Sequence, residues 1–441
     1  MTSAHFTFLI LGIATLLLSA CQSTTSRHSN TPLLVGPSEP ISNTTAPSKY
    51  KKLQNAEIFL DVAVPTFSPG FPLLKNSTEI DYEELDDSGI WPQLRRTEAK
   101  LFAVETKNAL EETKAFGAVR VVPNANTTAD IFVLGKILNS DSEQVGMQLT
   151  VVDSTGEVLG IKSFEHEVSE SYFRDQRNKD KNPYQPLFDK GRDYVLELLS
   201  KLDTETKQKI KETALLRYAR YYSPEAYGSY LSTEIKKKQG QRYYKFELTG
   251  LPAEDDAMLA RIEDLRAQEL LFVDRLQDQY DTFYAETSDA YEQWQRETLP
   301  EIAARREAIR NRNIKAGVGV GLAILAGILA SESSKDSRDA DRTGSGTERA
   351  KAGAKGAGAV IAGLGSIYAV NDAFQSNSEL KVQNAIIEEK GQAVDLSVSS
   401  TEMKFEDQVI ELQGTATEQY LQWKQHLRKI YELEATPDVQ L

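Results

Sequence analysis

The sequence contains few of the residues on which disulfide, thiol and metal chemistry depend. Its 441 residues include a single cysteine, at position 21, so no disulfide can form within one chain. Of its 4 histidines, His166 and His426 are the two in regions expected to fold, and no cysteine accompanies them. Zinc sites need several such ligands at close spacing. The sequence therefore predicts no metal site and no cofactor.

Basic residues are outnumbered by acidic ones. Lys and Arg total 51 against 65 Asp and Glu, which gives a formal net charge of -14. Proteins that bind nucleic acid gain affinity from clustered Lys and Arg against the phosphates. We therefore expect no nucleic-acid partner.

The motifs of common enzyme classes are also missing. There is no G-x-S-x-G, Walker, H-E-x-x-H or dinucleotide-binding fingerprint. The spacing Gly317-x-Gly-x-Gly lies in an apolar run expected to be helical, whereas a phosphate-binding loop follows a strand. Paired acids such as Glu83-Glu84 and Asp86-Asp87 fall in a polar loop, where solvated charge explains them. We expect a protein that is not an enzyme, with one alternative: a carboxylate hydrolase of cell-wall polymers, whose convergent acids a sequence cannot display.

The N-terminus has the pattern of an export signal. Residues 6–18 form an apolar run shorter than the roughly 20 residues of a membrane span, and small residues follow it in Leu18-Ser-Ala-Cys21. This tetrapeptide resembles the lipobox of bacterial lipoprotein signal peptides. One departure is that residues 1–5 carry no Lys or Arg. The alternative is a chance apolar N-terminus with a buried cysteine.

The resemblance to the lipobox implies a location. Cys21 would be the lipidated first residue of the mature chain, acylated with fatty acids such as palmitate after removal of residues 1–20. Gln22 at the next position, rather than Asp, implies sorting to the outer membrane, with the chain facing the periplasm. A membrane is therefore an expected partner.

The pattern along the chain predicts an α+β fold followed by a long helical hairpin. The expected segments are a signal peptide (1–20), a flexible tether (21–52), an α+β domain (53–203), a Tyr-rich helical connector (204–252), a long helix (253–312), a Gly-rich apolar hairpin tip (313–375), a return helix (376–436) and a tail (437–441).

The α+β domain is expected in the order β-α-β-β-β-β-α, a mixed sheet packed against two helices. Apolar runs of strand length, turn residues and helical periodicity place strands at 58–65, 119–122, 130–138, 146–153 and 158–164, and helices at 94–114 and 184–202.

Four stretches of this domain carry a second resemblance. They are IFLDVAV from Ile58, FGAVRVV from Phe116, TADIFVLGKI from Thr128 and LTVVDSTGEVL from Leu149. Together they are similar to the amino-terminal domain of TolB-type periplasmic proteins and to the curli-export outer-membrane lipoproteins, over about residues 56–202. The resemblance implies a fold used for protein docking and oligomeric assembly, with a second copy or an envelope protein as partner. An unrelated α+β domain is the alternative.

Seven tyrosines crowd the connector. Such enrichment marks either a protein interface or rings that pack a helix against its own chain. A strand is expected from 243 to 249, where apolar and polar residues alternate. The tyrosines are Tyr218, Tyr221, Tyr222, Tyr227, Tyr230, Tyr243 and Tyr244.

Two apolar stripes predict an antiparallel coiled coil. Pro300 is expected to kink or restart the first helix, and a basic collar follows it. The first stripe comprises Val273, Leu276, Tyr280, Phe283, Thr287, Ala290 and Trp294; the second comprises Phe405, Val409, Leu412, Ala416, Tyr420, Trp423, Leu427 and Ile430; the collar comprises Arg305, Arg306, Arg310, Arg312 and Lys315.

The hairpin tip holds two Gly/Ala-rich apolar runs, 316–330 and 353–370. A helix of 15 such residues is about 22 Å long, short of the roughly 30 Å hydrocarbon core. Small residues at four-residue spacing let helices approach closely, so the tip either contacts or enters a membrane or packs on itself as a glycine zipper in water. The candidate tip residues are Gly317, Gly321, Gly327, Gly356, Gly358, Gly363 and Gly365.

Two functions follow from these patterns. The first is a non-enzymatic outer-membrane lipoprotein, a docking or oligomerising component of an export or assembly complex whose hairpin contacts the membrane. The second is a periplasmic scaffold that binds a partner protein through its coiled hairpin.

Overall fold

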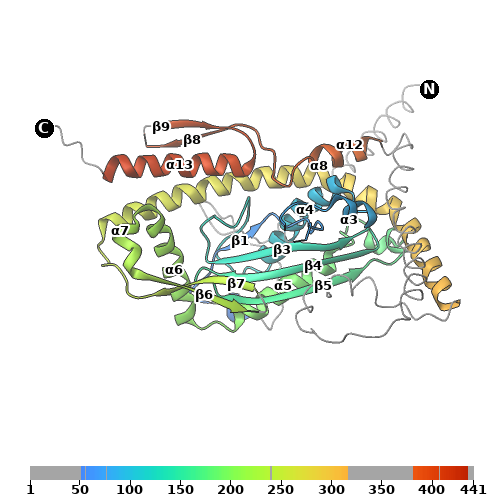
Figure 1. Ribbon diagram of the computed structural model, residues 1–441, viewed down its shortest axis with the longest axis horizontal. Helices are drawn as coiled ribbons and strands as arrows, with labels where there is room; N and C mark the ends of the chain where they lie inside the picture. The colour runs from blue at the N-terminus through green and yellow to red at the C-terminus, as the bar shows by residue number, and fades with distance from the viewer. Residues whose placement is uncertain are drawn as a thin grey trace, which may run out of the picture. The chain divides into compact units, whose positions relative to one another are not determined.

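Apolar residues between positions 58 and 167 supply the five strands of the main sheet (Figure 1). The computed structural model describes residues 51–54, 56–75, 77–238, 241–315, 381–406 and 408–435. All of these belong to one compact unit, 45–441.

The sheet is mixed, with strand order β2-β1-β3-β4-β5. The interior strand β1 pairs in parallel with β2 and β3, while β3, β4 and β5 form an antiparallel meander. The short β1 is buried on both faces, which suits its continuous apolar sequence. The strands are β1 (Val62–Pro65), β2 (Val119–Val122), β3 (Ile131–Ser140), β4 (Gln144–Asp153) and β5 (Val158–Glu167).

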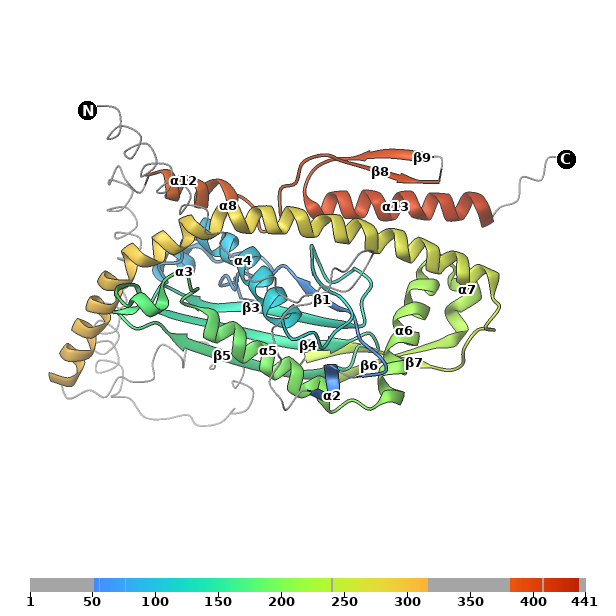
Figure 2. The ribbon, with the colours of Figure 1, turned by 180° about the vertical axis from the view of Figure 1, so that it is seen from behind.

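Two helices, α4 (Pro92–Glu111) and α5 (Gln185–Ser200), cover one face of this sheet (Figure 2). Alternate residues of β4 face them and are fully buried, namely Val145, Met147, Leu149 and Val151. The α+β class, the element order and both helices are confirmed. The prediction of a polar loop after β1 is wrong in part, because this segment contains the helix α3 (Tyr82–Asp87). The Asp81 side chain caps the N-terminus of α3 by accepting a hydrogen bond from the Glu84 amide.

The connector is half helix and half sheet. It consists of α6 (Thr204–Tyr222), α7 (Pro224–Tyr227), the 3-10 turn η4 (Gly228–Tyr230) and the hairpin of β6 (Leu231–Lys238) with β7 (Gln241–Leu248). The expected strand at 243–249 is present as β7. Its partner β6 was expected to be helical, because the lysine-rich sequence from Glu234 onward hides the alternation. Short pieces elsewhere are α2 (Lys51–Gln54), η2 (Tyr172–Arg174) and η3 (Gln176–Asn178).

The long helix α8 (Ala257–Lys315) is continuous and passes through Pro300. It begins where the Asp256 carboxylate accepts a hydrogen bond from the Leu259 amide at 3.0 Å. Its orange C-terminal part changes direction in Figure 2, as a proline inside a helix favours. The expected long helix is therefore present, bent rather than restarted.

The expected single return helix is wrong. The chain forms α12 (Lys381–Lys390), a β-hairpin of β8 (Thr401–Phe405) and β9 (Gln408–Leu412), and then α13 (Ala416–Ala435). Helix α12 is followed directly by Gly391, where a Cβ would lie 2.1 Å from the Gln93 carbonyl oxygen. The following residues alternate apolar and polar with a period of two, and the helical stripe drawn through Phe405 and Leu412 overlooked this alternation.

The two apolar stripes are nevertheless buried, apart from Val409, which is 62% exposed on β9. They do not simply bury each other. Helix α8 packs against α4, α6 and β2 as well as against α12 and α13, so much of its stripe faces the α+β domain. In both views α8 runs between that domain and α13 (Figures 1 and 2).

Candidate functional site

The residues predicted to meet the membrane lie outside the described part of the chain. They are Cys21 and the tip glycines Gly317, Gly321, Gly327, Gly356, Gly358, Gly363 and Gly365. The signal peptide, most of the tether and both Gly/Ala-rich runs lie there too. The structure does describe the two helices that flank the tip, α8 before it and α12 after it.

Helix α12 is fastened to α4. The Lys100 ammonium is 1% exposed and donates hydrogen bonds to the carbonyl oxygens of Lys390 (2.6 Å) and Ala393 (2.8 Å). The Thr97 hydroxyl donates to the carbonyl of Ile387 at 3.3 Å. Burial lowers the pKa of Lys100 to about 8, because the charged ammonium loses hydration. Helix α12, which follows the tip in the sequence, is thus held to α4 through its backbone carbonyl groups.

Helix α8 is fastened to the same α4 by a buried acid. Glu98 is fully buried; its Oε1 accepts hydrogen bonds from the hydroxyls of Tyr291 (2.7 Å) and Ser140 (2.6 Å), and its Oε2 pairs with Arg95 at 3.0 Å. Burial raises the pKa of Glu98, against the opposing effect of Arg95. Burial and the neighbouring carboxylate raise the pKa of Tyr291 well above its ordinary value.

A second buried acid repeats this arrangement seven residues along α4. The Glu105 carboxylate accepts from the Tyr284 hydroxyl and from the Asn182 amide, both at 2.7 Å. Burial raises the pKa of Glu105. Neither acid was predicted as a functional residue from the sequence, although their spacing of seven places them on one helix face. A charged residue within an otherwise apolar face was the available signal.

Two residues of the basic collar, Arg305 and Arg306, pair with acids of the chain itself. Arg306 pairs with Asp141 and Glu143, which lie at the turn between β3 and β4. Arg305 pairs with Glu301 one turn away on the same helix at 3.2 Å. The Arg310 side chain is exposed, and those of Arg312 and Lys315 lie outside the described residues. The sequence could not show the partners of Arg306, because they are distant in the chain.

The tyrosine cluster packs mainly within the chain. Tyr218, Tyr222 and Tyr227 are buried, and the first two hydroxyls lie 3.2 Å apart between α6 and its neighbours. Tyr221 and Tyr244 are 40% and 63% exposed. In-chain packing therefore explains the buried members, and only the exposed ones are accessible to a partner.

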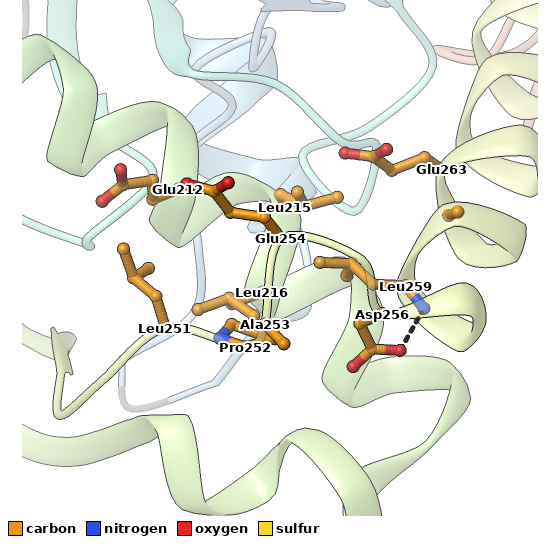
Figure 3. A pocket seen from close by; sticks show the side chains of 11 residues that line it. Glu212, Leu215, Leu216, Leu251, Pro252, Ala253, Glu254, Asp256, Leu259 and Glu263 are labelled. Atoms are coloured by element: carbon orange, nitrogen blue, oxygen red, sulfur yellow. Dashed lines mark hydrogen bonds between the residues drawn. The ribbon is translucent and has the colours of Figure 1, made fainter.

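A small pocket lies between α6, the loop after β7 and the start of α8 (Figure 3). Leu215, Leu216 and Leu259 line it, and acids including Glu212, Glu254 and Glu263 surround them. Its volume is about 200 Å³, below the roughly 300–1,000 Å³ of typical small-molecule sites. Asp256, which also lines the pocket, caps the start of α8 by accepting a hydrogen bond from the Leu259 amide.

Across the described residues, no group of three or more His, Cys, Asp or Glu side chains is placed to hold a metal ion. His166 lies on β5 and His426 stacks on Trp423 in α13, and burial lowers the pKa of both. Within those residues, every helix is too short or too polar to cross a membrane.

Comparison with known proteins gives no relative. No family model, curated protein or solved structure matches the chain.

Proposed function

We propose that this chain is a lipid-anchored, non-enzymatic protein of the bacterial cell envelope, and that it serves as a docking or oligomerising component of an outer-membrane export or assembly complex. Helices α8 and α12, which flank the Gly/Ala-rich segment in the sequence, bring this segment to the membrane. The lipobox-like Leu18-Ser-Ala-Cys21 is the observation that carries the location.

The way in which the flanking helices are attached supports a rigid mount for the segment. Residues 316–380 lie between α8 and α12 in the sequence. Both helices contact α4 through buried charged groups, α8 through Glu98 and α12 through Lys100. An ion pair between Lys390 and Glu286, 2.6 Å apart, joins the two helices directly. Elements fixed in this way would present a segment at a defined position, which a docking component needs.

The resemblance to the TolB amino-terminal domain and to curli-export lipoproteins supports an assembly role. The five-stranded mixed sheet with two helices on one face is compatible with it. The resemblance suggests a second copy or another envelope protein as the partner.

The test begins with Cys21. The full-length chain and its Cys21→Ser variant are expressed in a bacterium fed with labelled palmitate, and membranes are separated from soluble protein. We expect label and outer-membrane sedimentation for the natural chain and no label for the variant. An unlabelled natural chain with its leader intact would overturn the proposed location.

The role of the tip is tested separately by deleting residues 316–370. In a Cys21→Ser background, carbonate-resistant membrane association that the deletion abolishes would support membrane contact by the tip. If the Cys21→Ser chain with an intact tip is already fully extracted by carbonate, the tip does not insert. The scaffold alternative, in which the hairpin binds a partner protein, then takes its place.

A further inference from the structure

The β6–β7 hairpin carries a basic and apolar surface on an acidic protein. Residues 235–242 read IKKKQGQR, with four cations and no acid, whereas the chain as a whole has a net charge of -14. The strands pair in antiparallel register, with Ile235 opposite Tyr244 and Lys237 opposite Arg242. Because side chains alternate between faces, these four residues share one face.

The base of this hairpin is held by the protein. The Phe246 amide donates to the Thr155 carbonyl at 2.7 Å, and the Lys245 ammonium lies 3.2 Å from the Glu157 carboxylate. On the face that carries the four residues, Phe246 packs under the guanidinium of Arg217 from α6. These contacts fix where the hairpin points.

Beyond that base the same face is uncovered. Ile235 is 53% exposed and Tyr244 is 63% exposed. Lys237 and Arg242 are exposed, and neither has an ion-pair partner among the described residues. Lys236, on the opposite face, differs because it pairs with Glu234.

The pairing of Lys237 with Arg242 breaks a local rule. Like charges directly opposite each other destabilise a two-stranded sheet. A repulsion that no ion pair among the described residues offsets indicates that these cations serve to bind a partner. An anionic partner would remove this repulsion, because phosphate oxygens accept charge-assisted hydrogen bonds from both cations.

We propose that Ile235, Lys237, Arg242 and Tyr244 form a docking surface for an anionic phospholipid membrane. Charge complementarity selects the sign of the partner, and the exposed aliphatic and phenol groups select a lipid interface, where tyrosine rings favour the headgroup level. The proposal deepens the proposed function and rests on it, because a lipid at Cys21 would keep the hairpin near a membrane. The acidic remainder of the chain would be repelled, so this contact would orient the molecule.

The experiment uses the full-length chain reconstituted in vesicles. Tyr244→Cys is labelled with a polarity-sensitive aromatic dye, whose ring replaces the phenol. The matched control is Val409→Cys, a residue of similar exposure, 62%, on the separate β8–β9 hairpin. Vesicles contain phosphatidylethanolamine with phosphatidylglycerol, or phosphatidylcholine alone.

We expect a blue shift and protection from acrylamide quenching for the label at 244 in anionic vesicles only, lost at high salt, with no change at 409. Lys237→Gln with Arg242→Gln should lower the ratio of docked to free hairpin about 25-fold, since each cation near an anionic surface contributes about a factor of five. Equal quenching of the 244 label in both vesicle types overturns the proposal. So does a shift that appears in detergent and grows with protein concentration, which would mean self-association.

Failure of the anchor is visible in the same samples. A natural chain whose Cys21 is acylated takes up no dye, whereas a free thiol takes up one dye per chain. If Cys21 is free, the proposed function fails. The hairpin is then judged with the chain that combines Cys21→Ser and Tyr244→Cys, by flotation with the two vesicle types.

Discussion

The two halves of α8 are attached to the protein by different mixtures of apolar and polar contacts. Residues 262–283 pack mainly through large apolar and aromatic side chains, as where Phe272 stacks on Tyr420 of α13 with ring centres 6.5 Å apart, and the buried Glu269 of this half accepts a hydrogen bond from the Tyr420 hydroxyl. Residues 284–306 are attached through buried acids and a surface arginine, at Tyr284, Tyr291 and Arg306. The second half is the one that leads to the Gly/Ala-rich segment.

The difference separates stability from position. Apolar burial contributes free energy in proportion to area and has little direction, so it tolerates small shifts of a helix. A carboxylate that accepts two hydroxyls from fixed directions does not. We infer that the apolar half stabilises α8 on the domain, and that the polar half fixes which turn of α8 faces α4.

The largest effect is expected in the apolar half. Trp423 is fully buried, and its indole donates to the Gln268 carbonyl at 3.1 Å. Trp423→Ala should lower the free energy of unfolding by about 3–5 kcal/mol, because the ring is lost and a cavity remains. Urea denaturation measures it. The control Leu421→Ala, at a 43% exposed position of the same helix, should cost less than about 0.5 kcal/mol. Equal costs would contradict the role of this interface.

The next effect concerns Glu98. Glu98→Ala leaves the guanidinium of Arg95, which is 5% exposed, without its carboxylate. An unpaired buried charge should cost about 3 kcal/mol. Glu98→Gln keeps an oxygen acceptor for Tyr291 and should cost less. Hydrogen exchange should speed up in peptides covering 284–306 before those of α13. If α13 exchanged as fast, the two halves of α8 would be one cooperative unit and the comparison would fail.

Local patterns were enough to predict the α+β domain. Strand β2 was predicted with its exact bounds because its four residues, Val119–Val122, lie between clear turn signals. The stripe from Val273 to Trp294 was predicted as buried because helical periodicity persists over 22 positions. In each case the residues that decide the structure are close together in sequence.

The parts that were missed depend on distant residues. Nothing near Glu98 indicates that Tyr291, 193 positions away, will satisfy its carboxylate. The break after α12 depends on the approach of Gly391 to Gln93. Glycine occurs in loops for many reasons, so the close approach of Gly391 to Gln93 could be recognised only in the folded chain.

A smaller effect, which depends on pH, is expected at Lys100. Its pKa is about 8 when folded and 10.5 in the unfolded chain. Between these values the unfolded chain binds a proton that the folded chain releases, so the stability contributed by Lys100 rises with pH; below about pH 8 the cost of burying the charge is constant. Lys100→Met removes this rise.

The measurement is the difference in unfolding free energy between the natural chain and Lys100→Met at pH 7 and at pH 9.5. The natural chain should gain about 2 kcal/mol on the variant over this interval. Other titrating groups are common to both chains and cancel. A difference that does not change with pH would show that the ammonium stays charged when buried, and that α12 is held by an ion rather than by an amine.

The smallest effect tests whether α8 also closes the sheet. The Gln277 side chain accepts from the Val121 amide at 2.9 Å and donates to the Val121 carbonyl at 2.8 Å, as a neighbouring strand would at this edge. Gln277→Ala should cost about 1–2 kcal/mol and accelerate exchange in the peptide that covers β2. Gln277→Glu, which keeps only the acceptor, should fall between. Asp281→Ala, at an exposed position one turn further along, is the control. If Gln277→Ala behaves like Asp281→Ala, water replaces the side chain at no cost, and α8 is attached to this edge of the sheet by apolar contacts and by the ion pair of Arg120 with Asp274.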